Sequence, residues 1–223
     1  MRKTILACLL RLDNFLRRWI TYFSLESGVH PKHRLTNYHQ FFLDRVSPNE
    51  TVLDIGCGFG LLAYDVARKA RQVTGLDINK QYLATARSKH RLPNLTYIHG
   101  DATACSLPSK FNVIILSNTL EHIQDRVAFL KKLSPIADKF LIRVPMINRD
   151  WLVILKKELG VEYRLDLTHY VEYTEKTFRQ ELDNAGLAIT ELTVRFGEIY
   201  SVARPFPERP QGIFTTRLSQ PAH

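Results

Sequence analysis

The chain has 223 residues, of which 45% are hydrophobic and 24% are charged. These proportions are those of an ordinary globular protein with a core of useful size. No apolar run is long enough to cross a bilayer, which excludes a membrane-spanning protein at the sequence level. The length fits one domain with extensions.

The net charge of +9 is concentrated at the two ends of the chain. Residues 1–45 hold eight Lys or Arg against three Asp or Glu, and residues 201–223 hold three against one, so the middle carries only +2. Basic ends can contact phosphate, anionic lipid or an acidic substrate, or they can simply be solvated. Cys8, Cys57 and Cys105 show neither metal-site spacing nor a disulfide framework, which favours a reducing, cytoplasmic location.

The first 26 residues predict an amphipathic helix. Their start resembles a signal peptide, but Arg11 and Asp13 interrupt the apolar run and no cleavage site follows, so we expect the segment to be retained. One face of this helix carries Ile5, Leu9, Leu12, Leu16, Trp19, Ile20 and Phe23, and the other carries Lys3, Arg11, Arg17 and Arg18. Two interpretations stay open: a helix packed on the domain as a lid or dimer contact, or a helix lying in an anionic membrane surface.

From residue 51 onward, strand patterns alternate with helix patterns. After a break at Gly28–Pro31 and a polar, aromatic stretch, we expect strands at 51–55, 72–76, 95–99, 111–116 and 139–144, and helices at 61–70, 80–90 and 125–133. The continuous apolar run at 111–116 is typical of a central parallel strand. This alternation predicts an α/β fold with a doubly wound, mostly parallel, Rossmann-like sheet.

The last third of the chain has a different pattern. We expect a helix at 150–159, an irregular stretch at 161–173, a helix from the N-cap Thr174 to Ala185, and a hairpin of 188–195 with 199–203. The proline-rich tail after Arg204 is expected to be extended or disordered. The predicted organisation is a helical extension or lid at 1–46, one domain at 47–203 and a tail at 204–223.

The strongest motif is the run Val52–Gly60, in which a hydrophobic strand meets Gly56, Gly58 and Gly60. Alternate glycines let a ligand approach the backbone, although a tight strand–helix turn would also need them. Leu61 stands where a dinucleotide motif has its third glycine, which disfavours a nicotinamide dehydrogenase. Asp54 would repel a pyrophosphate but attract the ammonium of an amino-acid ligand. The run therefore predicts a cationic, amino-acid-like cofactor.

Two further acids stand at the ends of the next two strands. Asp77 can accept hydrogen bonds from both hydroxyls of a ribose, or it can cap the following helix. Asp101 can accept from an adenine amino group while Ala102 offers its N–H, although Gly-Asp is also common in turns. Because the acids follow successive strands, we expect them to meet at the crevice of an open α/β sheet.

On these residues the chain resembles the class I SAM-dependent methyltransferases over residues 51–203. The run 117–123 also resembles the segment after their fourth strand. The resemblance implies a seven-stranded sheet with a terminal antiparallel hairpin, and S-adenosyl-L-methionine as cofactor. It also implies the site residues: Asp54, Gly56, Gly58 and Gly60 for the methionine moiety, Asp77 and Ile78 for the ribose, Asp101 and Ala102 for the adenine, and Asn118 lining the site.

Within this family the chain is most similar to the branch that methylates small molecules, lipids and glycan precursors, including the quinone-biosynthesis methyltransferases. The run Asp166–His169, followed by Tyr173, resembles a run in that branch. The resemblance implies a small-molecule or lipid-like acceptor, with nucleic acid disfavoured. Peripheral membrane contact through residues 1–26 is compatible with such an acceptor.

Methyl transfer to a hydroxyl is helped by a general base, for which His122 and His169 are the best candidates. Tyr170 or Tyr173 could orient it. Alternatively, His122 caps a loop or contacts the cofactor, and His169 is structural. His30, His33 and His39 could fold over the substrate, but we favour ordinary surface histidines. No histidine or cysteine cluster resembles a zinc site, so no metal is predicted.

Other functions remain open at this point. The basic ends favour a methyltransferase of RNA or protein, but they lack interleaved aromatic and basic motifs. The Asn-Pro-Pro-Tyr motif of base-modifying relatives is also absent, because Thr119 and Leu120 follow Asn118. A non-catalytic SAM-binding partner subunit is disfavoured by the intact cofactor signature.

Overall fold

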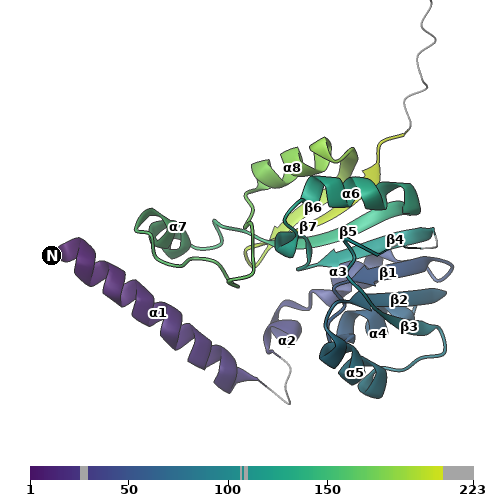
Figure 1. Cartoon of the computed structure of the whole chain (residues 1–223), viewed down its shortest axis with the longest axis horizontal. Coiled ribbons are helices and arrows are strands. Elements are labelled where there is room, and N and C mark those ends of the chain that lie inside the picture. Colours follow the sequence, from purple (N-terminus) through teal and green to yellow (C-terminus); the bar gives the residue numbers. More distant parts are fainter. Residues whose placement is uncertain (26–29, 106, 108–109, 208–223) are drawn as a thin grey trace, which may run out of the picture.

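A computed structural model describes residues 1–25, 30–105, 107 and 110–207 of the chain (Figure 1). Within these residues the strands form one seven-stranded sheet in the order β3-β2-β1-β4-β5-β7-β6. Strands β1 to β5 are parallel, and β7 is antiparallel to both β5 and β6. The strands are β1 (Thr51–Ile55), β2 (Gln72–Asp77), β3 (Leu95–His99), β4 (Phe111–Ser117), β5 (Ala137–Pro145), β6 (Leu187–Arg195) and β7 (Glu198–Pro205). The predicted fold, including its terminal hairpin, is confirmed.

Helices cover both faces of the sheet because the strand residues are apolar on both sides. In β4, Val113 and Ile115 join the core beneath α3, α4 and α5, whereas Ile114 and Leu116 join the core beneath α6 and α8. Figure 1 shows these two groups of helices on opposite sides of the sheet. The helices are α3 (His39–Arg45), α4 (Leu61–Ala67), α5 (Lys80–Lys89), α6 (Arg126–Leu133) and α8 (Glu175–Asn184).

The helix boundaries follow local capping chemistry. Asn79 accepts hydrogen bonds from the first turn of α5, and Asp125 does the same for α6. Thr174 caps α8 in a capping box, as its position in the sequence predicts. Two short 3₁₀ turns, η1 (Leu120–His122) and η2 (Ser134–Ile136), flank α6. The segment 161–173 is irregular, as expected.

The predicted division of the chain differs from the structure at both borders. Phe41 and Phe42 of α3 are buried in the core, so the end of the expected 1–46 extension packs as part of the domain. Strand β7 continues to Pro205, two residues beyond the expected domain end at 203. The predicted break at Gly28 and the tail from 208 onward lie outside the described residues.

The remaining helices, α1 (Arg2–Ser24), α2 (Lys32–Thr36) and α7 (Trp151–Glu158), lie beside the sheet and do not cover its faces (Figure 1). α1 lies against α7, and α2 lies between α1 and the domain (Figure 1). Lys156 of α7 donates to Asp13 at 2.6 Å and to Asn14 at 2.7 Å. No helix among the described residues is both long and apolar enough to span a bilayer.

Candidate active site

The glycine loop after β1 is shaped by close packing on one side and open space on the other. Gly56 has φ +74°, and a Cβ there would lie 2.4 Å from Oγ1 of Thr119. Gly58 has φ +54°, and a Cβ there would meet no atom within 4 Å among the described residues. The first glycine is therefore needed for packing, and the second leaves the backbone open to a ligand.

Asp54 lies in β1, two residues before Gly56. The residue is only 2% exposed, and its Oδ2 has no hydrogen-bond partner among the described residues. It lines a cavity of about 180 Å³ together with Gly56, Gly58 and Ser117. Burial, helped by the nearby charge of Asp77, raises the pKa of Asp54 to about 8. An uncompensated buried carboxyl facing a cavity fits a cationic ligand group.

Asp77 at the end of β2 fastens the glycine loop to the next strand. Its Oδ2 accepts from the N–H of Gly58 at 2.7 Å, and its Oδ1 accepts from the N–H of Asn79 at 2.7 Å. The cap of α5 is Asn79, so the alternative of Asp77 as that cap is wrong. Each carboxylate oxygen keeps a lone pair for a further donor, such as a ribose hydroxyl. Ile78, the next residue, is 66% exposed.

The third acid is placed differently. Asp101 is exposed, and its Oδ1 accepts from the backbone N–H of Thr103 at 2.8 Å and from its hydroxyl at 2.7 Å. These hydrogen bonds lower the pKa of Asp101. The turn alternative thus describes part of what Asp101 does, and Ala102 is buried in the core. Asp101 therefore stands on an exposed turn that its own hydrogen bonds hold in place.

The loop after β4 contributes Asn118 and Thr119. Asn118 has φ +53°, donates its N–H to the carbonyl of Arg143 at 2.8 Å and has a buried Oδ1 without a partner among the described residues. Oγ1 of Thr119 donates to the carbonyl of Ile55 at 2.8 Å and so joins this loop to the end of β1. An unpaired amide oxygen and a left-handed backbone at one position are typical of a functional loop.

Residues of the N-terminal segment close the same cavity. His33 and Tyr38 line it, and the hydroxyl of Tyr38 lies 3.0 Å from Nδ1 of His33. The guanidinium of Arg143 lies 3.6 Å from the centre of the Tyr38 ring. Burial, helped by nearby positive groups, lowers the pKa of His33 to about 4. The interpretation of His33 and His39 as ordinary surface histidines is wrong, because His39 is also partly buried and bonds Asp65 at 2.6 Å.

This closure is held by buried charges that the sequence analysis did not identify. Glu198 on β7 accepts from Nε of Arg143 at 2.9 Å and pairs with Lys32 at the start of α2. Both Arg143 and Glu198 are almost fully buried. The sequence shows Glu198 as a charged residue at the start of a strand, but the partners of Glu198 lie 55 and 166 residues away in sequence.

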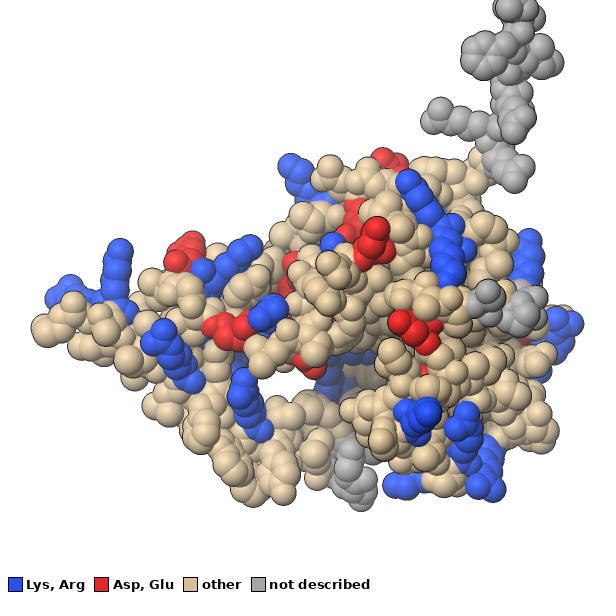
Figure 2. All heavy atoms as spheres, in the orientation of Figure 1, with Lys and Arg blue, Asp and Glu red and all other residues tan. Residues whose placement is uncertain are grey.

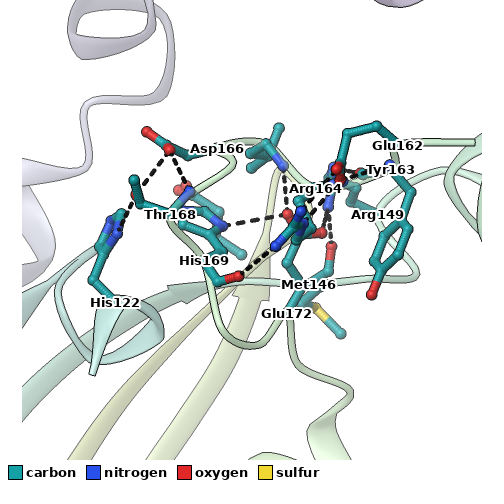
Figure 3. Close-up of polar contacts among 12 residues, drawn as sticks. His122, Met146, Arg149, Glu162, Tyr163, Arg164, Asp166, Thr168, His169 and Glu172 are labelled. Atoms are coloured by element: carbon teal, nitrogen blue, oxygen red, sulfur yellow. Dashed lines mark hydrogen bonds and ion pairs between the residues drawn. The ribbon is translucent and has the colours of Figure 1, made fainter. Parts of the chain in front are cut away.

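The two predicted catalytic histidines meet in space. The rings of His122 and His169 lie 4.6 Å apart between centroids, one in the turn after β4 and one in the irregular segment (Figure 3). They line a second cavity of about 320 Å³, together with Arg164, Thr168 and Tyr170. His122 is partly exposed and His169 is buried. Burial, together with the neighbouring His169, lowers the pKa of His122, which keeps it neutral near pH 7.

Glu121 is a site residue that the sequence analysis missed. Its side chain is fully buried, and neither oxygen has a hydrogen-bond partner among the described residues. Burial raises the pKa of Glu121 to about 8. The ligand atoms of Glu121, His122 and His169 lie within 4.8 Å of one another and could hold one divalent cation. Only the folding of the irregular segment onto the turn after β4 creates this arrangement.

A polar network supports the histidine segment (Figure 3). Glu172 lies 3.4 Å from Nδ1 of His169 and also pairs with Arg149, while Arg164 donates to the carbonyl of His169 at 3.1 Å. Tyr173 does not take part: its buried hydroxyl donates to Glu181 at 2.5 Å, so its expected orienting role is wrong. Tyr170 does line the cavity and is 62% exposed.

Comparisons with known proteins agree with this geometry. The family model described as "Methyltransferase domain" matches residues 52–137, which include the glycine loop, Asp77 and Glu121. The ubiquinone biosynthesis O-methyltransferase of Serratia proteamaculans is 30% identical over 173 residues, which cover 72% of this chain and 69% of the relative. The chain belongs to the class I SAM-dependent methyltransferases. It is therefore an enzyme that uses S-adenosylmethionine as its methyl donor.

Other relatives extend the comparison. The enzyme of the same name from Paracidovorax citrulli is 29% identical over 190 residues, covering 79% of this chain and 77% of the relative. Among solved structures, magnesium protoporphyrin IX methyltransferase from Synechocystis, with bound SAH, is 21% identical with a TM-score of 0.64. The match covers 91% of this chain and 99% of that one, which supports the fold. A Mesorhizobium loti SAM-dependent methyltransferase has 19% identity and a TM-score of 0.59, covering 75% and 96% of the two chains.

Proposed function

We propose that this methyltransferase transfers the methyl group to a hydroxyl of a small, lipid-like acceptor. The observation that carries this proposal is the second cavity. It is lined by His122, a histidine with a lowered pKa that stands in the turn directly after β4. The relatives' printed name, ubiquinone biosynthesis O-methyltransferase, supports an oxygen acceptor. An acceptor of this class also fits the expectation that residues 1–26 contact a membrane.

For the cofactor, we propose the residues that the family resemblance implies. The unpaired carboxyl of Asp54 would face the ammonium of the methionine moiety, and the open backbone at Gly58, with Gly56 and Gly60, would allow close approach. Asp77, with Ile78, would hold the ribose; Asp101 and Ala102 would contact the adenine; and Asn118 would line the site. The proposed catalytic domain comprises residues 47–203 and the final residues of β7.

The hydrogen bonds around Thr168 support His122 as the general base. Oγ1 of Thr168 donates to Asp166 at 2.8 Å and lies 2.9 Å from Nδ1 of His122. A hydroxyl has one proton, so Thr168 can only accept from His122, and Nδ1 of His122 must carry hydrogen. This tautomer leaves Nε2 of His122 free to accept a proton. Hydrogen bonds from Thr168 also lower the pKa of Asp166 and keep it ionised.

The transfer balances without any further reactant. S-adenosylmethionine supplies the methyl group as a sulfonium when it is bound. The acceptor oxygen would take the methyl group, S-adenosylhomocysteine would leave, and Nε2 of His122 would accept the hydroxyl proton. The buried His169 packs edge-on against the His122 ring and would position it. The protein mainly aligns the two reactants and excludes water.

The test is methyl transfer from labelled S-adenosylmethionine to a simple catechol, with and without an alkyl tail, followed by mass spectrometry. We expect a monomethyl ether and a lower KM for the alkylated catechol. Thr168→Val should lower kcat, and Thr168→Ser should restore it. Absence of product from both catechols, with labelled product from RNA or a protein instead, would overturn the proposal. If chelator treatment abolishes activity and a divalent cation restores it, the cluster binds metal and His122 is not the base.

A further inference from the structure

The apolar face of α1 is turned away from the rest of the molecule. Its large side chains range from 47% exposed at Trp19 to 75% exposed at Phe23. The whole set comprises Ile5, Leu9, Leu12, Phe15, Leu16, Trp19, Ile20, Tyr22 and Phe23. In an ordinary surface helix these residues would face the core. A packed lid would bury them, so α1 does not cover the domain with this face.

The opposite face of α1 makes the contact with the protein. Asp13 and Asn14 bond Lys156 of α7, and Asn14 also donates to the carbonyl of Glu162 at 2.7 Å. Leu10 is the buried apolar residue of this helix. At about 100° per residue, Leu10 and Asn14 lie on a different side of the helix from Leu9, Leu16 and Ile20, and Asp13 lies at the border between the two sides. α1 therefore docks through the side that carries Leu10 and Asn14, and its large apolar side chains remain exposed.

The charges of α1 indicate what covers that face. Residues 2–24 contain five basic residues against one acidic residue, a net charge of +4. Figure 2 shows Lys and Arg side chains along α1 beside an uncharged outer margin. Two copies of this helix would repel each other, whereas an anionic bilayer surface attracts it.

The carboxyl half of α1 has the side chains that favour a bilayer interface. Trp19 stacks on Phe23 with ring centroids 5.7 Å apart, and Trp19 also contacts Phe15 and Tyr22 edge-on. Tryptophan and tyrosine combine an apolar body with a polar tip and concentrate at the headgroup level. An exposed aromatic cluster on a basic helix is typical of a helix that lies in the plane of the interface.

We propose that α1 lies in the surface of an anionic lipid bilayer, held by its aromatic and aliphatic face and attracted by its basic residues. Docking through Asp13 and Asn14 to α7 then couples the catalytic domain rigidly to the bilayer. The inference concerns where the enzyme sits, so it does not depend on the proposed acceptor. An apolar acceptor dissolved in the same bilayer would be concentrated at this surface.

The test uses the full chain with vesicles of phosphatidylcholine alone or mixed equally with phosphatidylglycerol. We expect flotation with the mixed vesicles, weaker flotation with neutral ones, and partial loss in high salt. Leu16→Gln/Trp19→Gln/Ile20→Gln should lower partitioning on the order of a hundredfold, because three large side chains no longer enter the bilayer. Val194→Gln removes a comparably exposed apolar side chain on β6 and is the matched control.

Trp19 also reports on insertion directly. The chain has two tryptophans, so Trp151→Phe leaves Trp19 as the sole tryptophan, whose emission is excited selectively over that of tyrosine. We expect its emission to shift to the blue on mixed vesicles and to be quenched by brominated lipid. Unchanged emission and equal flotation of the triple variant would overturn the proposal. Concentration-dependent dimers of the wild type that the triple variant abolishes would instead assign the face to a second copy.

Discussion

The cofactor half and the acceptor half of the active site are built in different ways. In the proposed cofactor half, each group stands at or next to the end of its strand: Asp54 in β1 with the glycines after it, Asp77 at the end of β2 and Asp101 after β3. In the acceptor half, the turn after β4 supplies Glu121 and His122, and an irregular segment supplies Thr168 and His169. Local sequence therefore encodes the first half, whereas the second depends on tertiary contacts. Substitutions in the acceptor half should change catalysis but not cofactor affinity, and substitutions in the cofactor half should change cofactor affinity.

His122→Gln should give the largest effect and confine it to the acceptor half. We expect kcat to fall by about a hundredfold to ten-thousandfold because the proton acceptor is lost. The affinity for S-adenosylhomocysteine, measured by calorimetry, should stay within about twofold, since no bond joins His122 to the cofactor loop.

The pH profile distinguishes a base from a structural residue. Because burial lowers the pKa of His122, the wild-type rate should be level near neutral pH and fall only below the ordinary histidine range. The residual rate of the variant should lack this acid limb. An unchanged kcat, or a profile identical to the wild type, would remove His122 as the base.

Asp77→Ala should give the largest effect in the cofactor half. Loss of the ribose contacts and of the bond to the Gly58 N–H should weaken S-adenosylhomocysteine binding about a hundredfold. Asp101→Ala, on an exposed turn, should weaken it only about fivefold. Calorimetry of both variants ranks the two acids, and the reverse order would contradict the proposed roles.

Glu121→Gln should change stability more than it changes cofactor binding. The pKa of Glu121 is raised to about 8, so the folded enzyme retains a proton that the unfolded chain releases above its ordinary value. Stability contributed by the wild-type residue is therefore lost as pH rises between these two values. The variant removes this loss and should be more stable at pH 8 by a few kcal/mol at most, with little difference at acidic pH.

Urea unfolding at both pH values, after chelation, measures this difference. Asp44→Asn, at an exposed carboxylate that bonds Gln40, is the control and should show no pH-dependent gain. A variant less stable than the wild type at pH 8 would contradict the prediction, because the wild-type carboxyl would then not be destabilising at that pH.

The cofactor half could be predicted from the sequence to a greater extent than the acceptor half. The alternation of strands and helices follows from periodicity, the proposed cofactor acids stand at or next to the ends of their strands in a local pattern, and the observed sheet confirms the predicted fold. Glu121 was missed because its burial arises from packing in the folded chain, and Tyr173 was misassigned because its partner Glu181 lies on α8. The roles of His33 and Lys32 depend on Arg143 and Glu198, which are remote in sequence.

The buried carboxyl of Asp54 predicts that cofactor binding depends on pH. In the free enzyme the pKa of Asp54 is raised to about 8, so the residue carries a proton at neutral pH. The ammonium of S-adenosylhomocysteine favours the carboxylate, so binding should release this proton. Affinity should therefore strengthen by up to about tenfold per pH unit as pH rises through neutrality, and should level off above the pKa of Asp54.

Calorimetry in phosphate and in Tris at the same pH measures the release directly, because the two buffers differ in ionisation enthalpy. The apparent binding enthalpy should differ between buffers for the wild type and agree for Asp54→Asn, which has no proton to lose. Glu121→Gln should retain the buffer difference, because Glu121 belongs to the acceptor half. Buffer-independent heats in the wild type would mean that Asp54 is already ionised in the free enzyme, with a cation or ordered water in the cavity compensating its charge.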